Sequence, residues 1–260
     1  MRWDAVAAEW WKLRSVRSTY WTLGAAGAFL GCVLLLAVQT ARIWDGLSPE
    51  RRGDFGLRPL QELGGWGAAL CMAVLGVLSV TSEYRTGMIR TTFAAMPRRG
   101  TVLAARAAVV GAVALVAGEA VSVGAFLGTR LAVGDRPSPD QEASVAHELP
   151  GFAVTGASVA VFALLGVSLG VLLRSTAGAL VSVVVLWHVL PLLVDHLPEP
   201  WNGRAASVLP AALPRQVAGL SADHSIYGDL LSPGAAAAAM LAYALVPLGL
   251  AAFTLSRRDT

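Results

Sequence analysis

Apolar residues are gathered into six long blocks along the chain, and short polar segments separate the blocks. A helix needs about 20 mainly apolar residues to cross the hydrocarbon core of a bilayer, and every block reaches that length. None of the blocks contains more than two formal charges. The pattern predicts an all-α, polytopic membrane protein whose six transmembrane helices cover residues 20–39, 60–81, 102–129, 152–173, 177–197 and 235–255.

The composition of the chain fits this class. Hydrophobic residues make up 55% of the sequence and charged residues 14%, whereas soluble domains average about 25% charged residues. Because the segments between the blocks are too short for a separate globular domain, we expect residues 1–260 to form a single transmembrane domain. Cys32 and Cys71 lie within predicted helices and lack the spacing of a disulfide framework or a metal site.

Glycines recur at the spacing that lets membrane helices approach each other closely. Gly-x-x-x-Gly pairs occur at residues 27/31, 124/128 and 166/170. Since 27 of the 260 residues are glycine, chance accounts for pairs in this number. The motif therefore predicts no particular helix contact.

Positive charge is divided unevenly between the two sides of the predicted bundle. When the loops are counted alternately from the N-terminus, one side holds 12 Arg and Lys with 4 Asp and Glu, and the other holds 8 Arg with 12 Asp and Glu. Basic loops stay in the cytoplasm under the positive-inside rule, so we expect both termini to be cytoplasmic. The charge runs are too short and too close to the predicted helices to indicate nucleic-acid binding.

Residues 1–19 precede the first block and predict an amphipathic helix that lies along the membrane surface. On a helical wheel Trp3 and Trp10 fall on one side, and Glu9 and Lys12 fall on the other. Tryptophan and arginine side chains are favoured at the level of the lipid headgroups. The expected interfacial anchors are Trp3, Trp10, Arg14 and Arg17. A cytosolic extension of the first transmembrane helix is the alternative.

The polar segment of residues 82–100 lies between the second and third predicted helices. Gly87 permits a sharp change of backbone direction. Met88, Ile89 and Phe93 place apolar side chains at helical spacing. A short amphipathic helix of this kind suits docking into a groove on a partner protein. A solvated loop that satisfies the positive-inside rule is the alternative.

A second long polar segment, residues 198–234, lies between the fifth and sixth predicted helices. Its five prolines exclude a continuous helix. Apolar patches at residues 208–213 and 217–220 predict short helices that dip toward the bilayer. A proline-rich loop folded over the outer surface is the alternative, and either arrangement would form an external gate rather than a catalytic site.

Taken together, these features resemble the permease subunit of type 2 ATP-binding-cassette (ABC) exporters, and actinobacterial ones in particular. The similarity is carried by Glu83, Gly87 and Pro97, by the opening segment of residues 8–19, and by the turn at residues 172–178. It extends over the whole chain through the order of the interfacial helix, the six spans and the long external segment. The residues that the resemblance implies in coupling to an ATPase are Glu83, Tyr84, Arg85, Gly87, Met88, Ile89, Phe93 and Pro97.

The resemblance implies export of an unidentified substrate across a bacterial plasma membrane, driven by ATP that a separate subunit hydrolyses. ATP binding through a P-loop requires a glycine-rich loop with its lysine, and the only lysine here, Lys12, lies in no such motif. We therefore expect no cofactor on this chain, with ATP and Mg bound by two copies of an ABC ATPase. Six helices are few for a complete pathway, so a second permease copy, or a relative of it, is also implied.

Two ionisable side chains lie inside predicted helices, Glu119 in the third and His188 in the fifth. Charged groups at such depth usually face the interior of a bundle and mark transport pathways. We hypothesise that the two residues face each other or a polar part of the pathway. A protonated Glu119 bonded to the backbone or to Ser122 is the alternative. A proton-coupled secondary carrier that uses Glu119 is accordingly a second candidate function.

An intramembrane enzyme is the third class of function that we considered. The chain has no Gly-x-Ser-x-Gly elbow, no His-Glu-x-x-His zinc motif and no paired glutamates. The sequence therefore favours a transport subunit over an enzyme.

Overall fold

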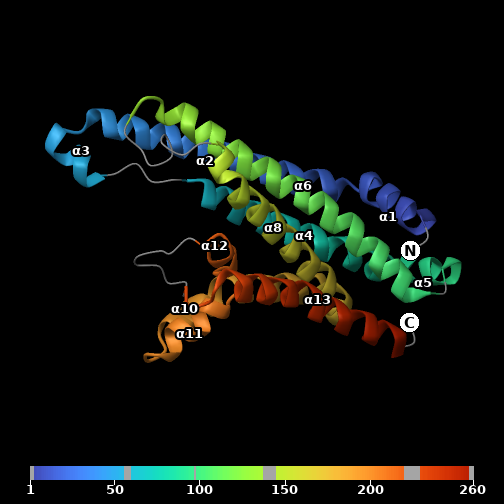
Figure 1. The fold of residues 1–260 in the computed structure, drawn as a ribbon. Helices are drawn as coiled ribbons and strands as arrows, with labels where there is room; N and C mark the ends of the chain where they lie inside the picture. Colours follow the sequence, from blue (N-terminus) through green and yellow to red (C-terminus); the bar gives the residue numbers. More distant parts are fainter. Residues whose placement is uncertain (1–2, 56–59, 97, 137–144, 220–228, 258–260) are drawn as a thin grey trace.

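The computed structural model describes residues 3–55, 60–96, 98–136, 145–219 and 229–257 (Figure 1). Within these ranges the chain forms helices joined by short turns, and no strand occurs. The all-α class predicted from the hydrophobic pattern is therefore confirmed for the described residues.

In the described part of the chain, six stretches of helix are long and apolar enough to cross a membrane, as predicted. Five are single helices: α2 (Arg17–Gly46), α4 (Gln61–Thr86), α6 (Arg99–Val133), α8 (Val145–Leu173) and α13 (Pro233–Arg257). The remaining stretch is composite and consists of α9 (Thr176–Val184), the π-helical turn η1 (Val185–Val189) and α10 (Leu190–Asp195). The length and composition of these helices indicate a multi-pass membrane protein.

Five short helices lie at the two ends of the bundle: α1 (Trp3–Ser15), α3 (Pro49–Phe55), α5 (Met88–Ala95), α11 (Trp201–Val208) and α12 (Leu213–Val217). Both chain termini lie near α1 and α5, at one end of the bundle, here named the α5 end (Figure 1). Helices α3, α10 and α11 lie toward the opposite end (Figure 1). An even number of crossings brings the two termini to the same end.

The centre of the bundle is the contact between α4 and α8, and α8 is the most deeply buried of the six spans. The two helices approach so closely that a Cβ atom at Gly76 would overlap the carbonyl oxygen of Ala163. The relation is reciprocal, because a Cβ atom at Gly166 would overlap the carbonyl oxygen of Ala73. Such backbone contact is the way membrane helices gain van der Waals packing without a hydrophobic driving force.

The fifth span contains a wide turn immediately before Pro191. The backbone N–H of Leu190 bonds to the carbonyl oxygen of Val185, five residues earlier. A proline cannot bond to the preceding turn and its ring crowds the carbonyl oxygen four residues back, which a wider turn relieves. The side chain of Trp187 leaves this turn toward the interior, where it is buried with its ring centre 3.7 Å from that of Phe162.

Replacing Gly76 by alanine should destabilise the bundle by about 1–3 kcal/mol, because the new methyl group meets backbone that cannot rotate away. The matched control is Gly31→Ala on α2, where a Cβ atom has open space around it. Thermal unfolding of the two variants in the same detergent measures the difference. Equal unfolding temperatures would show that α4 and α8 do not cross at Gly76.

Candidate functional site

At the α5 end the chain passes from α4 to α5 through the single residue Gly87. Its φ angle is 72°, in the left-handed region, and a Cβ atom there would meet nothing within 4 Å. The requirement for glycine is therefore conformational and not steric. This hairpin sets α5 across the end of α4 with no intervening loop.

Beneath this hairpin lies a group of charged residues, here named the ionic cluster: the buried Glu9, Glu83 and Arg106, and the partly exposed Lys12. Arg106 on α6 donates two hydrogen bonds to the Glu9 carboxylate of α1, of 2.7 Å from Nε and 3.2 Å from Nη2. Its Nη2 also donates to Oε1 of Glu83 on α4. One guanidinium therefore joins three helices that are distant in the sequence.

Lys12 completes the ionic cluster from α1. Its Nζ lies 2.8 Å from Oε1 of Glu9 and 3.1 Å from Oε1 of Glu83. The same ammonium group donates a hydrogen bond of 3.3 Å to the hydroxyl of Thr92 on α5. Four helices, α1, α4, α5 and α6, thus meet at a single set of polar contacts.

The charges of the ionic cluster are paired but desolvated. The side chains of Glu9, Glu83 and Arg106 are each 5% exposed or less. Burial by itself would raise the pKa of Glu9, but the hydrogen bonds and charges of Arg106 and Lys12 outweigh it and lower that pKa below its ordinary value. Oε2 of Glu83 is buried and has no hydrogen-bond partner within the described part of the chain. Buried charges of this kind are costly to leave without a partner.

The residues predicted to couple the chain to an ATPase take different positions in this region. Arg85 and Met88 are exposed at the tip of the hairpin, and Glu83 is buried in the ionic cluster. Ile89 was predicted on an exposed docking edge but is only 7% exposed, because it packs into the core of the bundle. Nothing is described of the side chain of Phe93, and Pro97 lies outside the described residues.

Tyr84, also predicted in the coupling segment, lies in the last turn of α4. Its ring is half-buried, and the Arg174 guanidinium lies 5.4 Å from the ring centre. Arg174 has a φ angle of 50° and ends α8 at the turn into α9. Tyr84 therefore connects α4 to the α8–α9 turn.

A helix is present at the predicted N-terminal position as α1. Trp3 is 85% exposed and Trp10 is 42% exposed, and the Arg14 guanidinium lies 5.9 Å from a Trp10 ring centre. Glu9 was expected on an outer polar face but is buried against α6. The side of α1 that packs on the bundle carries Ala5, Glu9 and Leu13, and the indoles are exposed. Arg17, the fourth expected anchor, begins α2 and is exposed.

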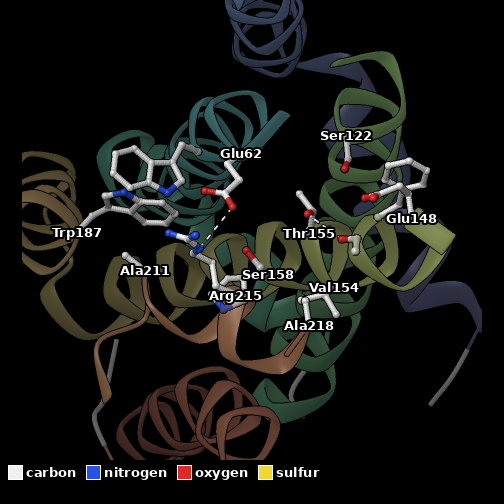
Figure 2. A pocket seen from close by; sticks show the side chains of 15 residues that line it. Glu62, Ser122, Glu148, Val154, Thr155, Ser158, Trp187, Ala211, Arg215 and Ala218 are labelled. Carbon is white, nitrogen blue, oxygen red and sulfur yellow. Dashed lines mark hydrogen bonds and ion pairs between the residues drawn. The ribbon is translucent and has the colours of Figure 1, made fainter. Parts of the chain in front are cut away.

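A cavity of about 130 Å³ lies near the opposite end of the bundle (Figure 2). Its walls come from α4, α6, α8, η1 and the segment around α12. The lining residues with polar groups or aromatic rings are Glu62, Trp66, Ser122, Glu148, Phe152, Thr155, Ser158, Trp187 and Arg215. None of these was predicted as a site residue, because they come from five separate segments whose approach has no local signature.

The segment between α10 and α13 is not a continuous helix, as its prolines predicted. It contains two short helices, which lie at residues 201–208 and 213–217 and not at the apolar patches of residues 208–213 and 217–220. Residues 220–228 lie outside the description. Gln216 holds it together: its Nε2 donates 2.7 Å to the carbonyl oxygen of Ser207, and its Oε1 accepts 2.8 Å from the backbone of Leu231. Leu213 is 1% exposed beneath them. The segment therefore packs on the bundle through buried side chains.

Glu119 and His188 are not joined by a hydrogen bond or ion pair in the described structure. Glu119 on α6 lies against Gly156 of α8, where a Cβ atom would overlap its carboxylate. His188 is exposed, and its ring stands 6.5 Å from that of Trp66. The expected bond from Glu119 to Ser122 or to backbone is likewise absent among the described residues.

Sequence reasoning did not identify Glu9 and Arg106 as site residues. Arg106 was counted only as a flanking charge, although it lies inside the third apolar block. An arginine within a span requires a partner, and the acidic residues at the same end were the candidates: Asp4, Glu9 and Glu83. That signal limits the partner to a few residues and does not select among them.

Comparison of this chain with models of known protein families finds no match. Comparison with curated proteins finds none either.

Replacing Arg106 by methionine should destabilise the protein by about 3–5 kcal/mol, because the Glu9 and Glu83 carboxylates then stay buried with Lys12 as their only cation. Trypsin should also cleave α1 faster, since Lys12 loses part of its enclosure. Thermal unfolding and timed proteolysis measure the two effects.

The matched control is Arg136→Met, which breaks an ion pair with Asp45 in which both side chains are solvent-accessible. Pairs of that kind contribute little, so this variant should resemble the wild type. If the two arginine variants unfold and are cleaved alike, the ionic cluster does not hold α1 in place.

Proposed function

We propose that this chain is the transmembrane permease subunit of an ABC exporter in a bacterial plasma membrane. The observation that carries the proposal is the α4–α5 hairpin, which has an exposed tip at the end of the bundle and a base held by the ionic cluster. The similarity of residues 82–100 to the coupling segment of such permeases supports it. The excess of Arg and Lys in the loops of the α5 end, 12 against 8, supports a cytoplasmic position for α5 and both termini.

In this function the ATPase is a separate pair of subunits that hold ATP and Mg. They would contact the exposed tip of the hairpin, where Arg85, Met88 and Thr91 are accessible. The exposed apolar faces of α2 and α13 would meet lipid or a second permease copy. The indoles of α1, with Arg14, would lie among the lipid headgroups.

The mechanism follows from how α5 is attached. A displacement of α5 would be transmitted directly to α4, because only Gly87 separates the two helices. It also reaches α1 and α6, because Thr92 of α5 bonds to Lys12 and Lys12 is paired with Glu83 beside Arg106. ATP-driven closure of the ATPase pair would thus shift the permease between inward-facing and outward-facing arrangements as a two-state switch.

Replacing Gly87 by valine should leave the protein inserted and folded but uncouple it from its ATPase. A β-branched residue in the left-handed region is strained by about 1–2 kcal/mol, which favours a rearranged hairpin over the present one. The measurement is purification of the tagged chain from its native membrane in mild detergent. The wild-type chain should co-purify with a stoichiometric amount of a protein that hydrolyses ATP. The Gly87→Val variant should co-purify with much less of that protein.

The matched control is Gly100→Val, which adds the same side chain at the same end, where a Cβ atom has open space and φ is not positive. It should retain the ATPase. Isolation of wild-type chain without any ATP-hydrolysing partner, or equal recovery with Gly87→Val, counts against the exporter.

A proton-coupled secondary carrier is the second candidate, and the observation in its favour is Glu119. This carboxylic acid sits within a span and has no hydrogen bond or ion pair among the described residues. Side chains of this type serve as proton carriers in membrane transporters.

Replacing Glu119 by glutamine separates the two candidates. If the chain is an exporter subunit, the variant should keep its abundance, its ATPase and its transport, because glutamine has the same size and the carboxylate bonds to no described residue. If it is a carrier, transport should fall to background and should depend on the proton gradient in wild-type vesicles. Uptake into inverted membrane vesicles, with ATP or with a pH gradient, measures both.

A further inference from the structure

Two mostly buried serines, Ser122 and Ser158, line the cavity near the opposite end of the bundle. Ser122 on α6 is 4% exposed and Ser158 on α8 is 6% exposed. Neither hydroxyl makes a hydrogen bond within the described structure, although most other serines of the spans bond to a carbonyl oxygen of their own helix, as Ser168 does. Both point into the cavity (Figure 2). The two hydroxyls are therefore polar groups of the cavity wall that water or a ligand can meet.

The formal charges of the side chains that line the cavity do not sum to zero. Glu62 and Arg215 form an ion pair, with Oε1 and Nε 3.4 Å apart. Glu148 also lines the cavity, is partly exposed, and has no hydrogen bond or ion pair among the described residues. The ionisable residues of the lining therefore include one carboxylate more than the cations present, which favours a positively charged ligand.

Aromatic rings face this carboxylate from the other side of the cavity. Trp66 and Trp187 meet edge to face with their ring centres 6.3 Å apart, and both line the cavity. In Figure 2 Trp187 lies on one side of the cavity and Glu148 lies on the other, with Thr155 and Ser158 between them. Indole rings bind apolar groups and attract cations through their π-face.

The size of the cavity limits what can enter it. Its volume of about 130 Å³ is close to the roughly 150 Å³ of a protein cavity that binds benzene. A single ring or a short branched chain fits, and a longer molecule would extend out of the open side.

We infer that this cavity binds a small amphipathic monocation, that is, an ammonium group on an apolar body of about one ring. The ammonium group lies at the Glu148 carboxylate, the Ser122 and Ser158 hydroxyl oxygens accept hydrogen bonds from the ligand, and the apolar body lies on Trp66 and Trp187. That this ligand is cargo rests on the proposed export function. The binding itself does not, because every group named belongs to this chain alone.

The test uses the purified full chain, without any ATPase, in lipid nanodiscs. The probe is benzylammonium, with benzyl alcohol and benzoate as neutral and anionic ligands of the same size. Saturation-transfer NMR titrations, corrected with empty nanodiscs, give the dissociation constants. Wild type should bind the cation about fivefold more tightly than the alcohol, which is the effect of one partly exposed charge pair. It should not bind benzoate.

Two variants locate the site. Glu148→Gln should weaken binding of the cation to the level of the alcohol and leave the alcohol unchanged, whereas Glu50→Gln, on exposed α3, should behave as wild type. Ser158→Leu should abolish binding of both by filling the cavity, with size-exclusion chromatography and thermal unfolding confirming that it folds. Cation binding that is unaffected by Glu148→Gln, or equal binding of benzoate, would overturn the inference.

Failure of this inference and failure of the exporter function give different results. If no probe binds but the ATPase still co-purifies with the chain, the cavity is not a cation site and the exporter function stands. If the cation binds through Glu148 and no ATPase is found, the site stands and the chain is not an exporter subunit.

Discussion

The contact of α4 with α8 is the constraint on which the remaining structure depends. In a bilayer the backbone polar groups of a span are satisfied within its own helix, so helices recognise one another through surface shape and side-chain contacts. Gly76 and Gly166 remove side chains at reciprocal points and let backbone meet backbone. The other spans are arranged around this pair, with α6 against both helices and α2 and α13 at the sides. Glycine position, and not overall hydrophobicity, fixes that geometry.

The ionic cluster adds directional contacts to this packing. Arg106 lies inside a span, where its charge requires carboxylates, and the two that reach it come from α1 and α4. Because an unpaired buried charge is so unfavourable, the cluster restricts α1 to one position beside α6. Lys12 then extends the same contacts to Thr92 of α5. A surface helix and a short hairpin helix are thereby held as parts of the bundle.

Helices α4, α6 and α8 connect the two ends of the molecule. At the α5 end, α4 carries Glu83 and α6 carries Arg106. At the cavity, α4 carries Glu62 and Trp66, and α6 carries Ser122. Helix α8, which packs against both, supplies most of the remaining lining. In the proposed exporter, movement of the hairpin would therefore reach the cavity walls through continuous helices. No loop, which could absorb the displacement, lies between the two regions on α4 or α6.

The sequence by itself determined the structural class of the protein, the six spans and the change of helix direction at Gly87. Segment length, apolar composition and the presence of a glycine are local properties. It also predicted that no continuous helix follows α10, since proline acts on its own neighbours. It did not reveal which glycines pack closely: the pairs at 27/31 and 166/170 look alike, yet only the second meets another backbone. The inward turn of Glu9, the burial of Ile89 and the cavity were decided by tertiary structure alone. Each depends on which faces of separate helices meet, and one sequence does not specify the rotation of a helix about its axis.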